Sequence, residues 1–171
     1  SATPSQWPNN PNRTVEKVSW NHVQVFLDRL NSQESNNRPV GWEYSLPTEA
    51  EWEYACRAGT RSIYPWGNSI DVTRANFASS GIGQTVDVAQ YKPNPWGFYD
   101  MQGNVFELTA DRYGAYNGSA VTNPTGATAG SDRVERGGSW YHDGTWLTSA
   151  KRSSAPIIRS VSPLGFRLAL R

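Results

Sequence analysis

The residues of this chain that could do chemistry include one cysteine, Cys56, and two histidines, His22 and His142. Among its 15 acidic residues, Glu107 stands out by its apolar surroundings. A cysteine becomes a nucleophile when a neighbouring cation lowers its pKa, but the sequence neighbours of Cys56 are packing residues, which favours a buried structural thiol. His22 falls in the first turn of a predicted helix, where a lone histidine is more often solvated or singly hydrogen-bonded than a metal ligand. A single cysteine also excludes an intrachain disulfide, a cysteine-type zinc cluster and a redox pair.

Glu107 follows Phe98 to Phe106, a stretch rich in aromatic and apolar residues. A carboxylate in such surroundings tolerates burial only beside an arginine, backbone donors or a cation. We therefore expect Glu107 to have a specific partner.

Two helices are predicted to position these residues. The first begins at Ser19, a suitable N-cap, and places Val23, Phe26, Leu27 and Leu30 at the i, i+3, i+4, i+7 spacing of one helix face.

The second helix begins at Thr48, which forms a capping box with Glu51, and it ends at Gly59. Its expected buried stripe consists of Trp52, Ala55 and Cys56. Short strands are predicted over 15–18 and 42–46.

Composition indicates one α+β domain. A chain of 171 residues is long enough to bury a core, and its 8 Trp, 8 Tyr and 5 Phe, with 15 Gly and 11 Pro, indicate a loop-rich fold with an aromatic core. Residues 1–14 form an extended lead-in held by Trp7, and residues 15–171 form the domain. The net charge of +1 does not indicate binding to nucleic acid. The sequence has no run of about 18 apolar residues, the length needed to span a bilayer.

One segment near the C-terminus has no regular pattern. Residues 136–140, Arg-Gly-Gly-Ser-Trp, precede it, and residues 164–167, Leu-Gly-Phe-Arg, follow it. Between these two frames, residues 141–163 show neither the period of about 2.0 of a strand nor that of about 3.6 of a helix. The two frames are predicted to be structural scaffold, and residues 141–163 between them are predicted to form the functional surface.

Six motifs in order give the chain a family resemblance. They read LPTEAEWEYACRAG from Leu46, YPWGN from Tyr64, ANF from Ala75, NPWGFYDMQGNVFEL from Asn94, RVERGGSW from Arg133 and LGFRLAL from Leu164. This order resembles the formylglycine-generating enzymes, or sulfatase-modifying factors. The resemblance implies a C-type lectin-like fold of that type, with two helices, a small twisted antiparallel β core and much irregular structure.

The catalytic chemistry of that family does not carry over with the fold. The resemblance places two copper-binding cysteines a few residues beyond the double glycine, where this chain has His142 and Leu147. Without a thiolate there is no soft copper site, so no catalytic residue is expected. The alternatives are a diverged formylglycine-generating-enzyme-like oxidase with other metal ligands, and a structural or regulatory domain that retains only the fold.

Calcium is a further expectation from the resemblance. Gly103, Val105 and Glu107 match one calcium site of the family, built from main-chain oxygens and the glutamate, so a structural Ca²⁺ would fit there. The alternative partner of Glu107 is an arginine, Arg136 or Arg167.

The chain also resembles the variable proteins of diversity-generating retroelements, whose C-terminal region is rewritten at template adenines. Adenine mutagenesis of asparagine codons cannot produce Glu, Gln or Met. Residues 141–163 contain no Glu, Gln, Met or Asn; Trp146 and Lys151 lie outside the set reachable from asparagine codons. The resemblance implies a non-catalytic, receptor- or adhesion-type protein that binds a protein or other macromolecule. It would be displayed on a bacterial or phage surface, with an anchor not in this chain.

Side chains that are free to vary cannot be core, because packed interiors respond to single methylene changes. The expected ligand-binding positions are therefore exposed: Tyr141, His142, Asp143, Gly144, Thr145, Trp146, Thr148, Ser153, Ser154, Ala155, Ile157, Ile158, Ser160, Val161, Ser162 and Pro163. The expected fixed positions between them are Leu147, Ser149, Ala150, Arg152, Pro156 and Arg159. Tyr141, Trp146, Ile157 and Ile158 are expected to form an apolar binding patch. The alternative for Trp146 and the two isoleucines is satellite core beneath a loop.

Overall fold

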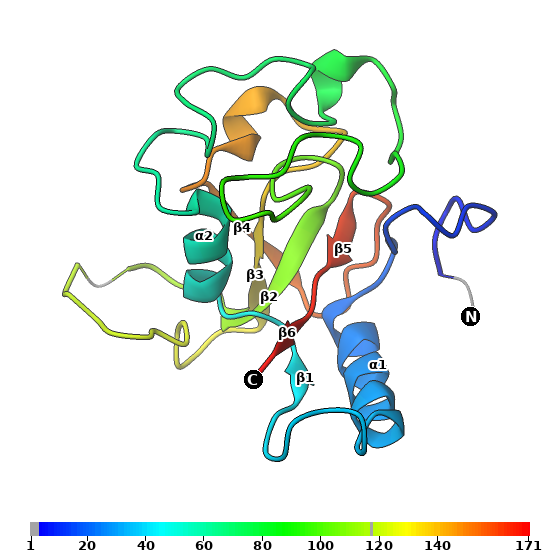
Figure 1. Ribbon diagram of the computed structural model, residues 1–171. Coiled ribbons are helices and arrows are strands. Elements are labelled where there is room, and N and C mark those ends of the chain that lie inside the picture. Colours follow the sequence, from blue (N-terminus) through cyan, green and yellow to red (C-terminus); the bar gives the residue numbers. More distant parts are fainter. Residues whose placement is uncertain (1–3, 117) are drawn as a thin grey trace.

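The computed structural model describes residues 4–116 and 118–171, and it has two helices beside a small central sheet (Figure 1). Residues 1–3 of the predicted lead-in lie outside the described residues. From Pro4 onward the lead-in consists of bends and turns, and the ring of Trp7 meets that of Trp140 edge to face at 6.0 Å.

Helix α1 (Trp20–Gln33) begins where its cap predicts. Ser19 Oγ accepts the His22 N–H at 3.2 Å, and His22 Nδ1 accepts the Ser19 N–H at 3.3 Å, so His22 is part of a capping box. Val23 and Leu27 are buried, whereas Phe26 is half exposed and meets the ring of Phe166.

Helix α2 (Glu49–Arg57) likewise has the predicted Thr48–Glu51 capping box. It ends at Ala58 in the left-handed region, followed by Gly59 at φ +84°. Trp52 and Cys56 are buried together with Met101, which confirms that the thiol belongs to the core.

The central sheet has the order β4-β3-β2-β5, formed by Arg152–Pro156, Asp132–Arg136, Phe106–Arg112 and Leu164–Phe166. The β2–β3 and β3–β4 pairs are antiparallel, but β2–β5 is parallel, so the expectation of an antiparallel core is corrected to a mixed sheet. A parallel pair needs a long connection between its strands, and residues 113–163 supply it. A second pair joins β1 (Tyr44–Ser45) to β6 (Ala169–Leu170).

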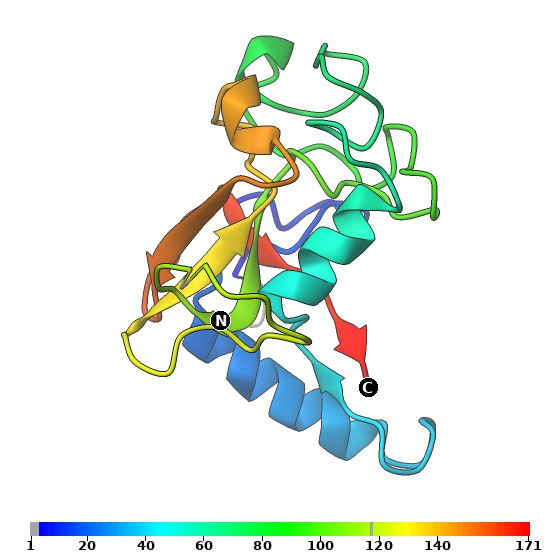
Figure 2. The same cartoon turned by 90° about the vertical axis from the view of Figure 1, so that its left-hand side faces the viewer.

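Two strand predictions were too long. Of residues 15–18, only Glu16 forms a bridge, to Gly165, and of residues 42–46 only Tyr44–Ser45 form a strand. Figure 2 shows α2 on one side of the sheet and α1 beneath it, while loops fill the opposite end. Those loops carry the 3₁₀ turns η1 (Ala78–Ser80) and η2 (Gly144–Leu147).

Besides the cluster of Trp52, Cys56 and Met101, the core has two larger clusters near the two ends of the molecule. The larger cluster lies between α1 and the sheet and is formed by Val18, Val23, Leu27, Leu46, Phe106, Leu108, Ala155 and Leu164. A second cluster of Tyr64, Ala75, Phe77 and Leu147 lies beneath η2. Residues 141–163 therefore run over two separate pieces of packed core.

Candidate ligand-binding face

Residues 141–163 are not wholly irregular. They contain η2 and the edge strand β4, whose five residues pair with β3 in unbroken register from Asp132–Pro156 to Arg136–Arg152. Serine-rich strands lack a clear hydrophobic alternation, which is why the sequence pattern did not reveal β4.

Arg136, the last residue of β3, holds this segment from inside. Its side chain is fully buried. Its guanidinium donates to the carbonyl oxygens of Ser149, at 3.1 Å, and of Lys151. The same group pairs with Glu49, at 3.5 Å, and with Glu53, both from α2. Helix α2 and the C-terminal segment are thus joined through one cation.

The two glycines after Arg136 permit close contact. Gly137 has φ +92°, and a Cβ on it would lie 2.8 Å from the Met101 carbonyl oxygen. Gly138 has φ +69°, and a Cβ there would lie 2.6 Å from Leu147 Cδ1. Both positions require glycine, as expected of a frame.

Arg152 and Arg159 anchor the segment to its surroundings. Arg152 donates to both carboxylate oxygens of Glu49 at 2.8 and 2.6 Å and to the Gly114 carbonyl oxygen at 2.6 Å. Its guanidinium also lies over the rings of Tyr113 and Tyr116, at 4.7 and 4.1 Å. Arg159 pairs with buried Glu135 at 3.2 Å; burial raises the pKa of that carboxyl, and Arg159 opposes the rise.

Exposure divides the predicted ligand-binding positions. Four are open to solvent: Tyr141, Asp143, Thr145 and Ile158, with Tyr141 at 68% and Ile158 at 76%. Half-buried positions are His142, Gly144, Trp146, Thr148, Ser153, Ser154, Ile157, Ser160, Val161, Ser162 and Pro163. Of the expected fixed positions, Leu147 and Ser149 are fully buried, whereas Ala150 and Pro156 are exposed, a correction to their predicted packing.

Ala155 corrects the prediction most clearly. It was expected to be exposed, yet its exposure is 0% and it belongs to the larger core cluster. The reason is its register on β4, which pairs Ala155 with Arg133 and points its methyl into the core.

Three other predicted positions are constrained by packing. A Cβ on Gly144 would lie 2.7 Å from Ile70 Cγ2, so a larger residue requires movement there. Trp146 packs against both core clusters, and Val161 packs against the larger one. The satellite-core interpretation therefore describes Trp146 better than full exposure does, and the exposed part of the expected apolar patch consists of Tyr141 and Ile158.

His142 lies in an aromatic enclosure. Its ring is 4.8 Å from Phe106, 5.5 Å from Tyr141 and 5.2 Å from Trp146, and its Nδ1 is 2.7 Å from Ser139 Oγ. Burial lowers the pKa of His142, so the imidazole favours its neutral form. The Lys151 ammonium lies 4.2 Å from the centre of the Trp146 ring.

The turn after His142 is held by short hydrogen bonds. Asp143 Oδ1 accepts from the Thr145 N–H at 2.8 Å and from its hydroxyl at 2.5 Å, and these bonds lower the pKa of Asp143. The Tyr64 hydroxyl donates to the Gly144 carbonyl oxygen at 2.9 Å. The backbone of this turn is thus fixed in part by two of its own exposed side chains, Asp143 and Thr145.

Thiol chemistry is not available to this face. Leu147, at one of the two expected cysteine positions, is fully buried in apolar core. Cys56 is also fully buried, and burial raises its pKa to about 12. Among residues 4–116 and 118–171, no three His, Cys, Asp or Glu side chains are grouped to hold a metal ion.

Glu107 pairs with an arginine, which was the expected alternative to a calcium ion. Arg167 pairs with it through Nε–Oε2 at 2.5 Å and Nη2–Oε1 at 2.6 Å, and Trp52 Nε1 donates to Oε2 at 2.6 Å. Arg136, the other candidate, instead pairs with α2.

Asp100 is a nearby carboxylate that the sequence did not single out. It lines a hollow of 380 Å³ together with Val105, Glu107 and Arg167. Burial raises its pKa, and its one hydrogen-bond donor in the described part of the chain is the Ala89 N–H at 2.7 Å. The sequence carried no signal for it, because its left-handed backbone, φ +53°, and its burial are set by the fold.

The family model of the sulfatase-modifying factor enzyme 1-like domain, FGE-sulfatase, matches residues 2–171. The chain belongs to this family. It is 34% identical over 176 residues to the formylglycine-generating enzyme of Mus musculus, covering 92% of this chain and 44% of that enzyme. It thus spans less than half the length of that relative.

Solved structures of this family type share the fold. Treponema denticola variable protein 1 is 27% identical, with a TM-score of 0.87 over 97% of this chain and 76% of the other. PvdO from Pseudomonas aeruginosa is 28% identical, with a TM-score of 0.79 over 95% of this chain and 63% of the other. The C-type lectin-like fold of the formylglycine-generating type and the likeness to a variable protein are both confirmed. In the described part of this family member, no helix is long and apolar enough to cross a membrane.

Proposed function

We propose that this protein is a non-catalytic ligand-binding protein of receptor or adhesion type, which binds a protein or other macromolecule through exposed side chains of residues 141–163. The observation that carries the proposal is the contrast around Arg136. A fully buried cation fixes the backbone at Ser149 and Lys151, while Tyr141 and Ile158 stand 68% and 76% exposed on that segment. Exposed aromatic and aliphatic side chains on a fixed backbone suit binding, because the backbone is already ordered and loses little conformational entropy when the ligand binds.

Diversification by a retroelement explains the composition of the same segment. Residues 141–163 lack Glu, Gln, Met and Asn, which fits adenine-directed rewriting, and the likeness to a Treponema variable protein supports it. Packing refines which positions can vary freely. Ala155 and Gly144 are constrained by their neighbours, and Asp143 and Thr145 are exposed but hold the turn through their own hydrogen bonds. Tyr141 and Ile158 are the exposed positions left free to vary. Display on a bacterial or phage surface is part of the proposal.

The test is a clustered substitution on the exposed positions. Tyr141→Ser with Ile158→Ser should abolish binding to whatever surface ligand a display screen selects, while leaving the fold unchanged. A matched pair outside the segment, Val40→Ser with Tyr54→Ser, is at least as exposed and should leave binding intact. Loss of binding in the second pair and not in the first would overturn the assignment of the face.

The oxidase alternative rests on the family relationship. It requires a redox metal, and copper or iron retained through purification, with turnover of a thiol peptide, would establish it. The burial of Leu147 and the raised pKa of Cys56 favour the binding function instead.

The calcium site at Gly103, Val105 and Glu107 stays a prediction. Arg167 and Trp52 already engage both oxygens of Glu107, so this carboxylate is compensated without a metal ion, and the arrangement fits an ion pair better than a calcium site. Asp100 is the second carboxylate that a hard cation would use. A rise in melting temperature with Ca²⁺ that Asp100→Asn abolishes would establish the site.

A further inference from the structure

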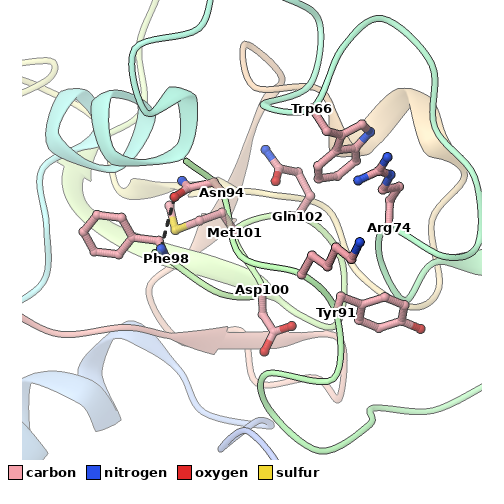
Figure 3. A pocket seen from close by; sticks show the side chains of 9 residues that line it. Trp66, Arg74, Tyr91, Asn94, Phe98, Asp100, Met101 and Gln102 are labelled. Carbon is pink, nitrogen blue, oxygen red and sulfur yellow. Dashed lines mark hydrogen bonds between the residues drawn. The ribbon is translucent and has the colours of Figure 1, made fainter. Parts of the chain in front are cut away.

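A second hollow lies outside the variable segment. Its volume is 240 Å³, and its lining residues are Pro65, Trp66, Arg74, Lys92, Pro93, Asn94 and Pro95. An adjoining cavity of 10 Å³ shares Trp66, Arg74, Lys92 and Asn94 with the hollow. Figure 3 shows Trp66, Arg74 and Asn94 among the side chains that line this cavity.

The hollow concentrates positive charge. Arg74 and Lys92 both line it, both are exposed, and neither forms an ion pair among residues 4–116 and 118–171. No acidic residue lines the hollow itself. Asp100 lines the adjoining cavity, where its carboxylate accepts from the Ala89 N–H. Asp71 lies near enough to Arg74 for the two charges to interact, but Asp71 does not line the hollow. Two cations and no carboxylate in the lining favour an anionic ligand.

The apolar wall of the hollow is preorganised. The indole of Trp66 stacks on Tyr64 with ring centroids 5.5 Å apart and planes 4° apart, and its Nε1 donates to the Ser69 carbonyl oxygen at 2.9 Å. Trp66 is half-buried and lines the hollow, so the part of its indole that its neighbours leave uncovered offers a flat surface. The C–H groups of a ring ligand are attracted to such a surface because the π face carries partial negative charge.

A further wall, formed by Asn94, is held equally firmly. Asn94 donates to the carbonyl oxygens of Ala55 and Cys56 at 2.7 and 3.1 Å and accepts from the N–H groups of Trp96 and Phe98 at 3.0 and 3.1 Å. These bonds use the Asn94 amide fully, so the polar side chains left for a ligand are those of Arg74 and Lys92.

We propose that this hollow binds an acidic sugar residue, with the carboxylate between Arg74 and Lys92 and the ring against Trp66. A hydroxylated ring suits the site because the exposed rim, which includes Pro93 and Pro95, leaves the outer face of a bound ligand in water. All lining residues precede residue 141, so this subsite stays constant whatever the variable segment carries. The inference is independent of the proposed function.

The test is an NMR titration of the ¹⁵N-labelled chain with glucuronate, with glucose and acetate as partial probes. Glucuronate is expected to shift the Trp66 indole signal saturably, and Arg74→Gln or Lys92→Met should each weaken binding by about two- to fivefold, because each removes one exposed charge pair. Arg29→Gln, an exposed change of the same charge on α1, should leave the affinity unchanged. Because Arg74 and Lys92 make no ion pair with the described residues, both variants should keep the wild-type spectrum elsewhere.

Four results would overturn the inference. The first is the absence of a saturable shift with glucuronate, and the second is undiminished binding by the double variant Arg74→Gln, Lys92→Met. Equal binding of glucose would mean that the charges play no part, and equal binding of acetate would mean that the ring plays none.

Discussion

Replacing Arg136 with methionine should destabilise this protein strongly. The guanidinium is fully buried, pairs with two carboxylates of α2 and donates to two carbonyl oxygens of the C-terminal segment. Methionine fills much of the volume but leaves Glu49 and Glu53 with less compensation and the carbonyls of Ser149 and Lys151 without this donor. Breaking a buried ion pair from one side costs about 3–5 kcal/mol, a large fraction of the roughly 5–15 kcal/mol that stabilises a typical domain.

Urea denaturation followed by tryptophan fluorescence measures this cost. With a slope of about 2 kcal/mol per molar urea, the midpoint should fall by roughly 1.5–2.5 M. Arg136→Lys should recover only part of the lost stability. The planar guanidinium reaches two carboxylates and two carbonyl oxygens at once, and the compact ammonium of lysine cannot. Arg171→Met is the matched control, since Arg171 and its partner Glu51 are 45% and 50% exposed and such pairs contribute about 0–1 kcal/mol. If Arg136→Met cost no more than Arg171→Met, the claim that this cation holds the segment would be wrong.

Three further predictions concern buried and exposed positions. Tyr141→Ser with Ile158→Ser should change the free energy of unfolding by less than about 1 kcal/mol, because both side chains face solvent, and thermal denaturation checks this. Ala155→Leu should cost about 1–3 kcal/mol through overpacking, which urea denaturation would show; a neutral result would mean that β4 can turn this position outward. Burial raises the pKa of Cys56 from 9.0 to about 12, so the unfolded chain loses this proton first and stability should fall as pH rises above about 9. Cys56→Ala should flatten that fall in urea midpoints measured between about pH 8 and pH 10.5, and an unchanged slope would contradict the assignment.

Local signals predicted the helices well. Ser19 and Thr48 each cap a helix through side-chain bonds within three residues, and such short-range chemistry is visible in sequence. The double glycine at 137 and 138 was likewise recognisable, because close backbone contact requires that residue type.

Non-local pairing decided what the sequence could not predict. Ala155 and Ile158 lie close together in a segment without hydrophobic alternation, yet one is buried and the other is exposed because β4 pairs with β3 in a fixed register that ends at Pro156. Glu107 lies opposite Arg136 on β3 as well as opposite Gly165 on β5. It pairs with Arg167 because the Arg136 side chain pairs instead with Glu49 and Glu53 of α2. Neither the burial of Ala155 nor the partner of Glu107 can be predicted from neighbouring residues in the sequence.

Deep sequencing of codons 136–167 of this gene across a population of the organism tests the central claim most directly. If the segment is a diversified binding face on a fixed scaffold, substitutions should concentrate at codons 141 and 158, whose side chains are exposed, and should be rare at codons 147, 149 and 155, whose side chains are fully buried. They should also trace to adenines of a nearby template repeat. A population without such changes, or one in which the buried codons vary as often as the exposed ones, would contradict the account.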